Sequence, residues 1–319
     1  LNAVADAYSD QARVSSTPNE TNNIIRSCHI INTGRYGVHV GSAERGATLI
    51  GNHIDSARAF GLYFCSQAQY SVVVGNTFYH CRSGIGGSDT RHSNQESVTS
   101  STPYDDIVGD IGSLISGNVF LGGPVNNPKS SENTSVYAID VGPKSVVSGN
   151  VILHYNGGVR LVDGAVDCIV QGNYIHLPDF STGLGIQILN GAHGANISGN
   201  TIVGSKLIET GISIEAANDI MIASNTMHSL ATAIKLGANS ERITINNCKI
   251  SDIADTWAPI KIYGATTDVR IDIREVDAAG VDGIVSFNGG QGAAAQTRLI
   301  LNNISDNGSD NPALAGSWN

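Results

Sequence analysis

Charged and aromatic side chains are scarce in this chain of 319 residues. Only 14% of the residues are charged and 6% are aromatic, and 28 acidic side chains outnumber 18 basic ones, which gives a net charge of −10. No cluster of lysine and arginine interrupts the acidic average, and a negative surface repels polyanions. We therefore expect no nucleic-acid partner.

Long hydrophobic runs are also lacking. No stretch of about 18 consecutive apolar residues is present to span a bilayer. The opening LNAVADAYSD has neither the basic region nor the apolar region of a signal peptide. We expect no membrane insertion and no signal peptide in this chain. Hydrophobic residues still make up 41% of the sequence, which is enough for a sizeable core.

The cysteines form no recognisable metal or redox motif. They are five in number, widely spaced and without a CxxC pair, and the nine histidines show no ligand spacing either. We expect no metal site, no cofactor and mostly buried thiols. The cysteines are Cys28, Cys65, Cys81, Cys168 and Cys248.

What the chain has in abundance is a repeated phrase. It reads LIGNHI, VVGNTF, ISGNVF, VSGNVI, VQGNYI, ISGNTI and IASNTM, and successive asparagines are 24, 42, 32, 23, 27 and 25 residues apart. A base period of this length with longer exceptions is typical of a solenoid. The asparagines are Asn52, Asn76, Asn118, Asn150, Asn173, Asn200 and Asn225.

A second phrase follows each first one, with a small residue, an apolar residue, a variable residue and another apolar residue. Examples are GVHV, GLYF, AIDV, GVRL, GIQI, GISI, AIKL and PIKI. These are short strands of period 2, and neither a leucine-rich repeat nor a helical repeat fits them. We predict an all-β fold: a right-handed parallel β-helix of about ten coils. It should cover residues 22–305, between a lead-in segment 1–21 and a tail 306–319.

The repeated asparagine should turn its amide inward at a bend of each coil. There it can hydrogen-bond the amides above and below and the local backbone, forming a ladder. Cys28 and Cys248 occupy the asparagine position one period before and one period after the ladder. A cysteine there avoids a buried amide that lacks one partner, although drift at the ends of the repeat is an alternative.

Two polar insertions break the period, at residues 87–110 and 122–135. Both are predicted to be loops because they are rich in serine, threonine, asparagine and aspartate. They leave neighbouring coils, so they can flank one stretch of surface, and binding sites favour such loops.

The GN-x-I ladder and the GIxI strands resemble the right-handed parallel β-helix superfamily, which is pectate-lyase-like, and most of all bacteriophage tailspike and polysaccharide depolymerase bodies. The motifs of polygalacturonases (NTD, GHG, RIK), of alginate epimerases (DPHE) and of calcium-binding nonapeptides are absent. The resemblance implies a polysaccharide-degrading module, a glycoside hydrolase or lyase, acting in a groove along the β-helix. It also implies an extracellular or virion location on a phage tail. The alternative is a non-catalytic glycan-binding or shaft module.

The variable position of the second phrase should face outward and stack from coil to coil. Its residues, called the outer column, are His39, Tyr63, Gly86, Asp140, Arg160, Gln187, Ser213, Lys235 and Lys261. We expect the outer column to face solvent between the two insertions and to form the groove.

Asp140 and Arg160 should be neighbours about 4.8 Å apart. Asp140 is the candidate acid or base and Arg160 the candidate substrate clamp, and an ordinary cross-strand ion pair is the alternative. Asp140→Asn is accordingly expected to abolish activity with little change in melting temperature. Gly86 should leave a gap where a sugar ring approaches the backbone.

Tyr63 could stack on a sugar or transfer a proton, and His39 and Gln187 are candidate substrate contacts. A lyase would use Tyr63 or His39 as base, with Arg160 neutralising a uronate.

A glycosidase needs a second carboxylate, about 5–5.5 Å or 6.5–9.5 Å from the first. We single out Asp106 and Glu132 as catalytic candidates and Asp89 as a substrate contact, while Glu209 and Glu215 are a reserve pair. The other carboxylates of the insertions are Glu96, Asp105 and Asp110.

One outward row on the strand before each ladder asparagine is unusually apolar. This apolar strip consists of Thr48, Val72, Leu114, Val146, Ile169, Asn196, Met221 and Thr244. A continuous apolar surface needs a cover, and tailspike-like proteins assemble as trimers. We predict a homotrimer with Val72, Leu114, Val146 and Ile169 near its axis. Segment 1–20 is the alternative cover.

Overall fold

The computed structural model describes most of the repeat region. The described residues are 22–34, 36–40, 45–64, 68–86, 110–122, 137–178, 183–254, 258–264, 266–277, 284–288, 297–301, 304–305 and 314–315. Asp89, Asp106 and Glu132 lie outside these residues, as do Cys65 and the predicted lead-in segment 1–21. Among the described residues, no helix is long and apolar enough to cross a membrane.

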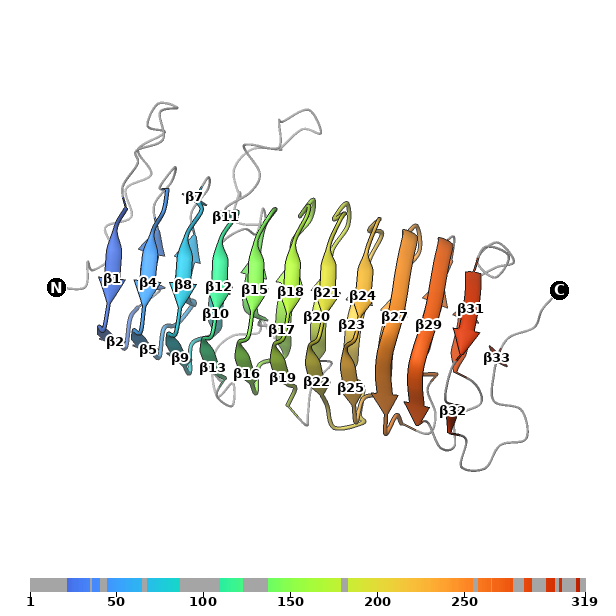
Figure 1. Cartoon of the computed structure of the whole chain (residues 1–319). Helices are drawn as coiled ribbons and strands as arrows, with labels where there is room; N and C mark the ends of the chain where they lie inside the picture. The colour runs from blue at the N-terminus through green and yellow to red at the C-terminus, as the bar shows by residue number, and fades with distance from the viewer. Residues whose placement is uncertain are drawn as a thin grey trace.

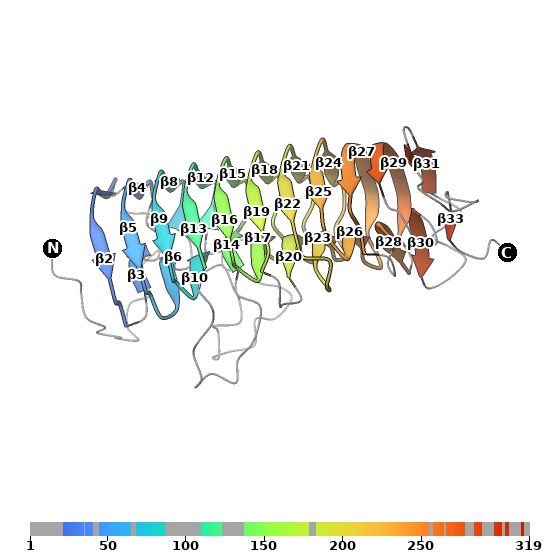
Figure 2. The same ribbon diagram turned by 90° about the horizontal axis from the view of Figure 1, so that it is seen from below.

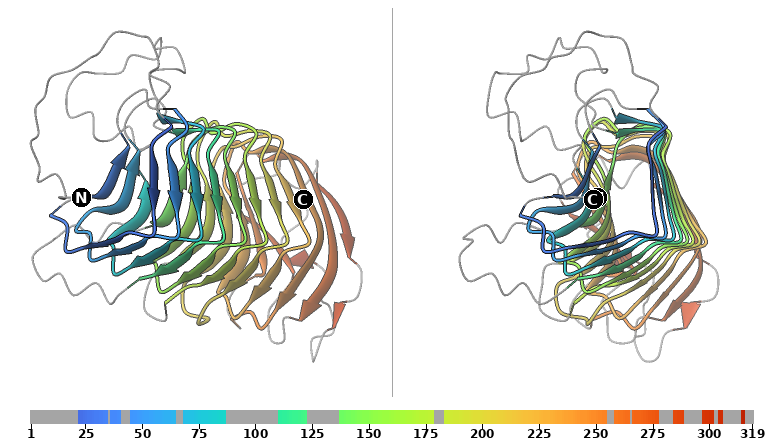
Figure 3. Two further views of the ribbon diagram at one scale, coloured as in Figure 1. Left: turned by 60° about the vertical axis from the view of Figure 1, so that its left-hand side comes forward. Right: turned by 90° about the vertical axis from the view of Figure 1, so that its left-hand side faces the viewer.

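The chain winds into a right-handed parallel β-helix with β1 and β33 at opposite ends of the stack (Figure 1). Each of the first eight coils contributes three strands, and every pairing between coils is parallel. The first and second strands of the coils form a 20-stranded sheet, and the third strands form an 11-stranded sheet. Viewed along the axis, the stacked coils share one angular cross-section (Figure 3). The predicted fold class is confirmed.

Eight coils have three separate strands each, slightly fewer than the expected ten. Their first strands are β1 (Ile24–Arg26), β4 (Thr48–Ile50), β8 (Val72–Val74), β12 (Leu114–Ser116), β15 (Val146–Ser148), β18 (Ile169–Gln171), β21 (Asn196–Ser198) and β24 (Met221–Ala223). Their second strands are β2 (His29–Ile31), β5 (His53–Asp55), β9 (Thr77–Tyr79), β13 (Val119–Leu121), β16 (Val151–Leu153), β19 (Tyr174–His176), β22 (Thr201–Val203) and β25 (Thr226–His228).

The third strands follow beyond a second bend and lie beside one another (Figure 2). They are β3 (Tyr36–Val40), β6 (Phe60–Phe64), β10 (Ser83–Gly86), β14 (Tyr137–Val141), β17 (Gly157–Leu161), β20 (Leu184–Ile188), β23 (Thr210–Ile214), β26 (Thr232–Leu236), β28 (Ile260–Tyr263), β30 (Val285–Asn288) and β33 (Leu314–Ala315).

Later coils depart from the three-strand plan. Their first two strands merge into β27 (Glu241–Ser251) and β29 (Thr267–Asp277), which β31 (Thr297–Leu301) and β32 (Ile304–Ser305) continue. Near the other end, β7 (Ala68–Gln69) and β11 (Asp110–Ile111) form a separate two-stranded sheet. Pairing of β33 with β30 extends into the predicted tail 306–319.

The core is a set of aliphatic columns enclosed by the two sheets. The inward column of the first strands is 0–1% exposed, as the alternation of the repeat predicts. The third strands add Val38 with Val40 and Ile212 with Ile214, all buried. Phe78 and Phe120 stack face to face on adjacent coils, with ring centroids 4.7 Å apart. The first-strand column is Leu49, Val73, Ile115, Val147, Val170, Ile197, Ile222 and Ile245.

The asparagine ladder exists as predicted, and each side chain is only 1–2% exposed. In the middle of the ladder, Asn150 Nδ2 donates to Asn173 Oδ1 at 2.9 Å and to the Ile115 carbonyl at 3.0 Å. Asn150 Oδ1 accepts from the backbone N–H and from Nδ2 of Asn118 at 2.9 and 3.0 Å. All four of these hydrogen bonds of the Asn150 side chain join it to the coils before and after its own. They form only when the asparagines of successive coils lie in line, so they fix the register between coils.

The bend beside the ladder explains the glycine of the GN phrase. Six glycines that precede ladder asparagines have φ between 61° and 65°, a region that side chains disfavour. They are Gly51, Gly75, Gly117, Gly149, Gly172 and Gly199.

Cysteines occupy the ends of the ladder. At one end the Cys28 backbone N–H donates to Asn52 Oδ1 at 3.0 Å, and at the other end Cys248 is fully buried above Asn225. None of the four cysteines in the described part of the chain forms a disulfide. Burial raises the pKa of Cys81 to about 11, so that this thiol stays protonated at neutral pH.

Truncating the ladder in its middle should destabilise the protein strongly. Asn150→Ala leaves the backbone N–H and one side-chain N–H of Asn118 buried without a partner, and we expect a loss of about 3 kcal/mol or more. Urea unfolding measures this loss. The control is Asn246→Ala on the exposed face of β27, which should change stability by less than about 0.5 kcal/mol. Equal effects at the two positions would contradict the role of the ladder.

Candidate functional site

The outer column lies on the outer face of the 11-stranded sheet in the predicted register. His39, Tyr63 and Gly86 pair in sequence across β3, β6 and β10. Ile85 pairs with Ile139, which places Gly86 next to Asp140. From there the pairing runs through Asp140, Arg160, Gln187, Ser213, Lys235 and Lys261 without a shift.

The expectation that this column faces solvent is wrong for its middle and its C-terminal end. Asp140 is 5% exposed, Ser213 1% and Lys261 6%. Only His39 is classed with the exposed residues. Polar groups in this column therefore act in a partly desolvated environment, where electrostatic interactions are stronger than in water.

Asp140 and Arg160 form a bidentate ion pair. Arg160 Nε donates to Asp140 Oδ1 at 2.9 Å and Nη2 donates to Oδ2 at 2.7 Å. The two side chains are 6% and 11% exposed. Both carboxylate oxygens accept hydrogen bonds from the guanidinium, a strong and directional arrangement.

Tyr137 joins this pair, and sequence reasoning missed it. The Arg160 guanidinium carbon lies 4.8 Å from the centroid of the Tyr137 ring, in cation–π contact. The Tyr137 hydroxyl donates to Gln187 Oε1, and Gln187 Nε2 donates to Glu215 Oε1 at 2.8 Å. A polar network thus links four successive coils.

Tyr137 was missed because strict alternation places it on the inner side together with Ile139. The strand bends at the small residue between them. Gly158 is the residue of the next coil equivalent to Ala138, and a side chain there would lie 2.9 Å from Ile175 in the core. Ala138 therefore points inward, and Tyr137 before it points outward. The small residue that opens each second phrase was the signal that could have found Tyr137.

Four aromatic rings cluster at the N-terminal end of the column. Tyr36 and Tyr63 stack with centroids 4.3 Å apart and an 11° tilt. His39 lies 5.4 Å from Tyr63, and Phe60 lies 5.5 Å from it. The sugar contacts predicted for Tyr63 and His39 stay predictions, and the two residues belong to one aromatic cluster.

The predicted gap at Gly86 is absent. A Cβ atom built on Gly86 would lie 2.4 Å from Phe60 Cε1 and 3.4 Å from Asp140 Oδ2. The Phe60 ring fills the space that the missing side chain leaves. Glycine here lets the aromatic cluster pack against the ion pair.

The reserve carboxylates do not form a pair. Glu209 is fully buried and holds the loop after β22, since its carboxylate accepts from the Ser205 hydroxyl and from the Leu207 backbone N–H. Glu215 instead accepts from Gln187 in the network described above. Glu209 is therefore structural, which corrects the prediction that Glu209 and Glu215 form a reserve carboxylate pair.

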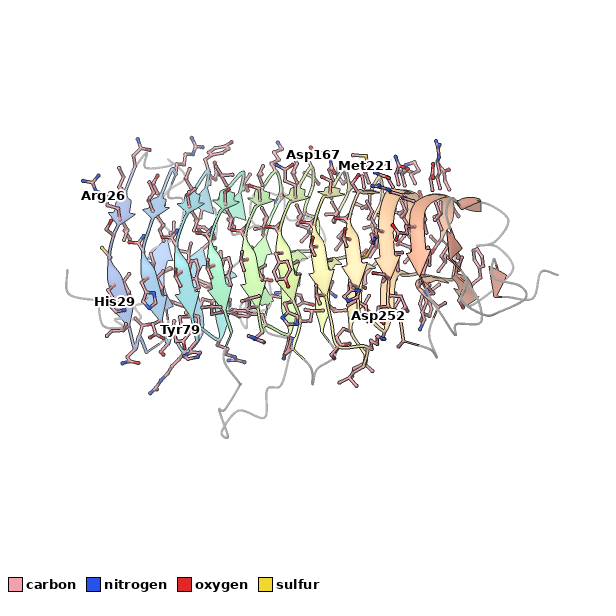
Figure 4. The ribbon with its side chains drawn as sticks, turned by 60° about the horizontal axis from the view of Figure 1, so that its bottom comes forward. Arg26, His29, Tyr79, Asp167, Met221 and Asp252 are labelled. Atoms are coloured by element: carbon pink, nitrogen blue, oxygen red, sulfur yellow. The ribbon has the colours of Figure 1, made fainter. Side chains whose placement is uncertain are left out.

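No metal site emerges from the side chains whose positions are known. No three His, Cys, Asp or Glu side chains in the described ranges lie close enough together to hold an ion. His29 and His53 meet edge-on, with centroids 4.6 Å apart, on the outer face of β2 and β5. His29 is labelled in Figure 4.

A shallow groove of about 550 Å³ follows the bend between the first and second strands, away from the outer column. It offers hydroxyl and amide groups but no titratable side chain, so it cannot carry acid–base chemistry. Its lining residues are Ser148, Gly149, Gln171, Gly172, Ser198, Gly199 and Ser224.

Comparison with known proteins places this geometry in context. The sequence profile of a family described as a right-handed β-helix region matches residues 138–317. No curated protein matches the chain by sequence.

Two solved structures share the fold. One is a mutant tailspike protein of E. coli bacteriophage HK620 in complex with a hexasaccharide, with a TM-score of 0.51 and 13% identity over 79% of this chain. The chain spans 49% of the length of that tailspike. The other is the A-module of the Azotobacter vinelandii mannuronan C-5 epimerase AlgE4, with a TM-score of 0.50 and 11% identity. That match covers 92% of this chain and 81% of the module. At these identities the likeness concerns the fold alone.

The burial of the ion pair changes what a substitution at Asp140 should do to stability. Asp140→Asn leaves the Arg160 guanidinium buried without its counter-charge, and we expect the free energy of unfolding to fall by about 3–5 kcal/mol. Urea unfolding measures the difference. The sequence alone had predicted almost no change, because the pair was assumed to be exposed.

An exposed pair of the same geometry provides the control. Arg242 forms a bidentate pair with Asp219, and both side chains are about half exposed. Asp219→Asn should have little effect on stability because water screens the pair. Similar small losses at Asp140 and Asp219 would show that burial does not matter at Asp140.

Proposed function

The chain belongs to the family of right-handed β-helix regions, and from this premise we propose that it binds a polysaccharide lengthwise along the outer column and degrades it there. The proposed substrates are glycans of the bacterial surface or extracellular glycans. The observation that carries the proposal is the row of aromatic rings, buried ion pair and polar network on one face of adjacent coils.

The row has the length and the chemistry for an extended chain of sugars. Nine residues of the outer column span eight strand spacings, about 38 Å. The aromatic cluster around Tyr63 can stack on sugar faces, while Gln187 and Arg160 can hydrogen-bond hydroxyl groups. A saccharide in the tailspike complex with a similar fold agrees with this role.

Tyr137 is the proposed proton-transfer residue. Its hydroxyl donates to Gln187 Oε1, and its ring lies against the Arg160 guanidinium. Asp140 holds Arg160 in place against the ring and is proposed to act through that contact. Tyr63 is the second candidate for proton transfer.

Hydrolysis and elimination make different demands on this site. Asp140 is the carboxylate of the outer column, and Glu215 lies beside the column, directly after β23. The strands β14 and β23 are three spacings apart, about 14 Å. Two-carboxylate hydrolysis works at about 5–9.5 Å. Hydrolysis would therefore take its second carboxylate from Asp106 or Glu132, with Asp89 as a further substrate contact. Elimination instead needs a uronate at the cleaved bond: a tyrosine removes the proton beside the carboxyl group, the leaving oxygen takes up a proton from the tyrosine hydroxyl, and Arg160 neutralises the carboxylate.

Glycan binding without cleavage is the second candidate function. The observation that favours it is the engagement of both Asp140 oxygens by Arg160, which leaves this carboxylate poorly placed to donate or accept a proton. In that case the column is a recognition surface on a structural shaft.

Incubation with a panel of bacterial surface polysaccharides separates these possibilities. Unsaturated products that absorb in the ultraviolet indicate elimination, and new reducing ends without that absorbance indicate hydrolysis. Tyr137→Phe should lower the rate at least about 100-fold, because the proton-transfer group is lost while the ring remains. Tyr174→Phe, on the exposed face of β19, is the matched control and should retain full activity. Full activity of Tyr137→Phe would overturn the proposed role of Tyr137.

The apolar strip supports the proposal of a homotrimer. Its residues pair in register on the outer face of the first strands. Leu114 is 38% exposed and Met221, labelled in Figure 4, is 42% exposed; Ile50 beside the strip is 45% exposed. We propose that neighbouring chains cover this surface, with Val72, Leu114, Val146 and Ile169 near the axis, as in an extracellular or virion-borne shaft.

Light scattering tests the proposed assembly. The wild-type chain should give three times the 33.2 kDa of one chain, and Leu114→Lys should shift it towards that monomer mass because a buried unpaired charge is costly at an interface. Leu207→Lys makes the same change at an exposed leucine away from the strip and should leave the mass unchanged. A wild-type mass of one chain at micromolar concentration would refute the trimer.

A further inference from the structure

Two lysines stand directly opposite each other at the C-terminal end of the outer column. Lys235 on β26 pairs with Lys261 on β28, so their side chains leave the same face of adjacent coils. Like charges placed opposite each other on a sheet are destabilising. Lys261 is 6% exposed, and burial, followed by the charge of Lys235, lowers the pKa of its ammonium group.

Lys235 lacks a carboxylate partner of the kind that Lys206 and Lys249 have. Lys206 pairs with Asp252, and Lys249 pairs with Glu275 on the opposite sheet. No ion pair among the described residues includes Lys235, whose ammonium instead lies 5.5 Å from the centroid of the Tyr263 ring. A cation beside an aromatic ring is still able to accept an anion from outside.

The neighbouring position on the previous coil carries an unused hydroxyl. Ser213 pairs with Lys235 in the register and is 1% exposed. Its Oγ has no hydrogen-bond partner among the described residues. An orphan polar atom at this depth costs free energy in the unliganded protein, and a bound acceptor would recover it.

We propose that Ser213, Lys235 and Lys261 form a subsite for one acidic group, a carboxylate, carried by the bound glycan. This proposal rests on the proposed function and specifies its substrate class. The Asp140–Arg160 pair is neutral as a unit, whereas Lys235 has no ion-pair partner among the described residues, so Lys235 supplies the positive charge for the subsite. The acidic sugar therefore binds about 14 Å from Arg160, three strand spacings along the axis.

The surroundings favour a glycan whose acidic residues are separated by neutral ones. Gln187 and Ser213 are uncharged, and they fill the two positions between Arg160 and Lys235. The Glu215 carboxylate lies against Gln187 and disfavours a second acidic sugar there. The net charge of −10 opposes binding of a uniformly charged polymer. A single carboxylate held by the Lys235 ammonium and the Ser213 hydroxyl, with Lys261 beside them, overcomes that field locally.

The experiment compares each bacterial surface polysaccharide of a panel in its native acidic form and after carboxyl reduction, by isothermal titration calorimetry with the full chain. The wild-type protein should bind the acidic form of its ligand about tenfold or more tightly than the reduced form. Lys235→Gln should abolish that preference. Lys249→Gln, on the other sheet, is the matched control and should keep it.

Ser213→Ala provides an independent variant whose folding is not in question. Removing a hydroxyl without a partner should leave the melting temperature unchanged and still weaken binding of the acidic form severalfold. A merely structural serine would show the opposite pattern, a lower melting temperature with unchanged affinity.

The outcomes separate the subsite from the proposed function. If the protein binds a glycan but does not distinguish its acidic and reduced forms, or if the preference survives in Lys235→Gln, the subsite is overturned and glycan binding stands. If no polysaccharide of the panel binds, the proposed function fails. If millimolar inorganic phosphate stabilises the protein through Lys235 while acidic glycans gain nothing, the site takes a free anion and the glycan assignment is overturned.

Discussion

Hydrogen bonds between equivalent residues of successive coils are the constraint on which the whole structure depends. A single coil cannot bury its apolar face, so each coil is stable only when another stacks on it. The asparagine ladder makes this stacking specific, because each amide is satisfied only when the next asparagine lies directly above it. A slip of one residue would turn the inward aliphatic columns outward and leave these amides unpaired.

The same register creates the surface chemistry. Asp140 and Arg160 are 20 residues apart in the chain and share a bidentate ion pair. Gln187 and Glu215 are 28 residues apart and share a hydrogen bond. Because each third strand contributes one residue to the outer column, the column is an ordered series of side chains along the axis of the β-helix. It begins with aromatic rings, passes through a neutral ion pair and ends with two lysines, and this order gives the surface a direction.

The two sheets differ in what they expose. The 20-stranded sheet carries the apolar strip, where Leu114 and Met221 keep more than a third of their surface accessible. The 11-stranded sheet carries the outer column, whose charged members are mostly buried among aromatic rings and hydrogen-bonding partners. Partial burial makes charges costly unless they are paired, and it also strengthens each interaction that is made. Assembly and ligand binding are therefore proposed for different faces of one solenoid.

By itself, the sequence determined the fold class, the asparagine ladder, the inward columns and the register of the outer column. Alternation of period 2 shows which side chains point inward, and the spacing of about 24 residues shows which residues of successive coils are equivalent. Only the tertiary structure decided how deeply each outward residue is buried. Alternation tells the direction of a side chain but not what lies over it, so Asp140 and Lys261 were expected in solvent. It also decided that Phe60 fills the space at Gly86, that Glu209 holds a loop, and that a bend at a small residue turns Tyr137 outward. These depend on side-chain volumes and backbone bends between coils, which no single repeat contains.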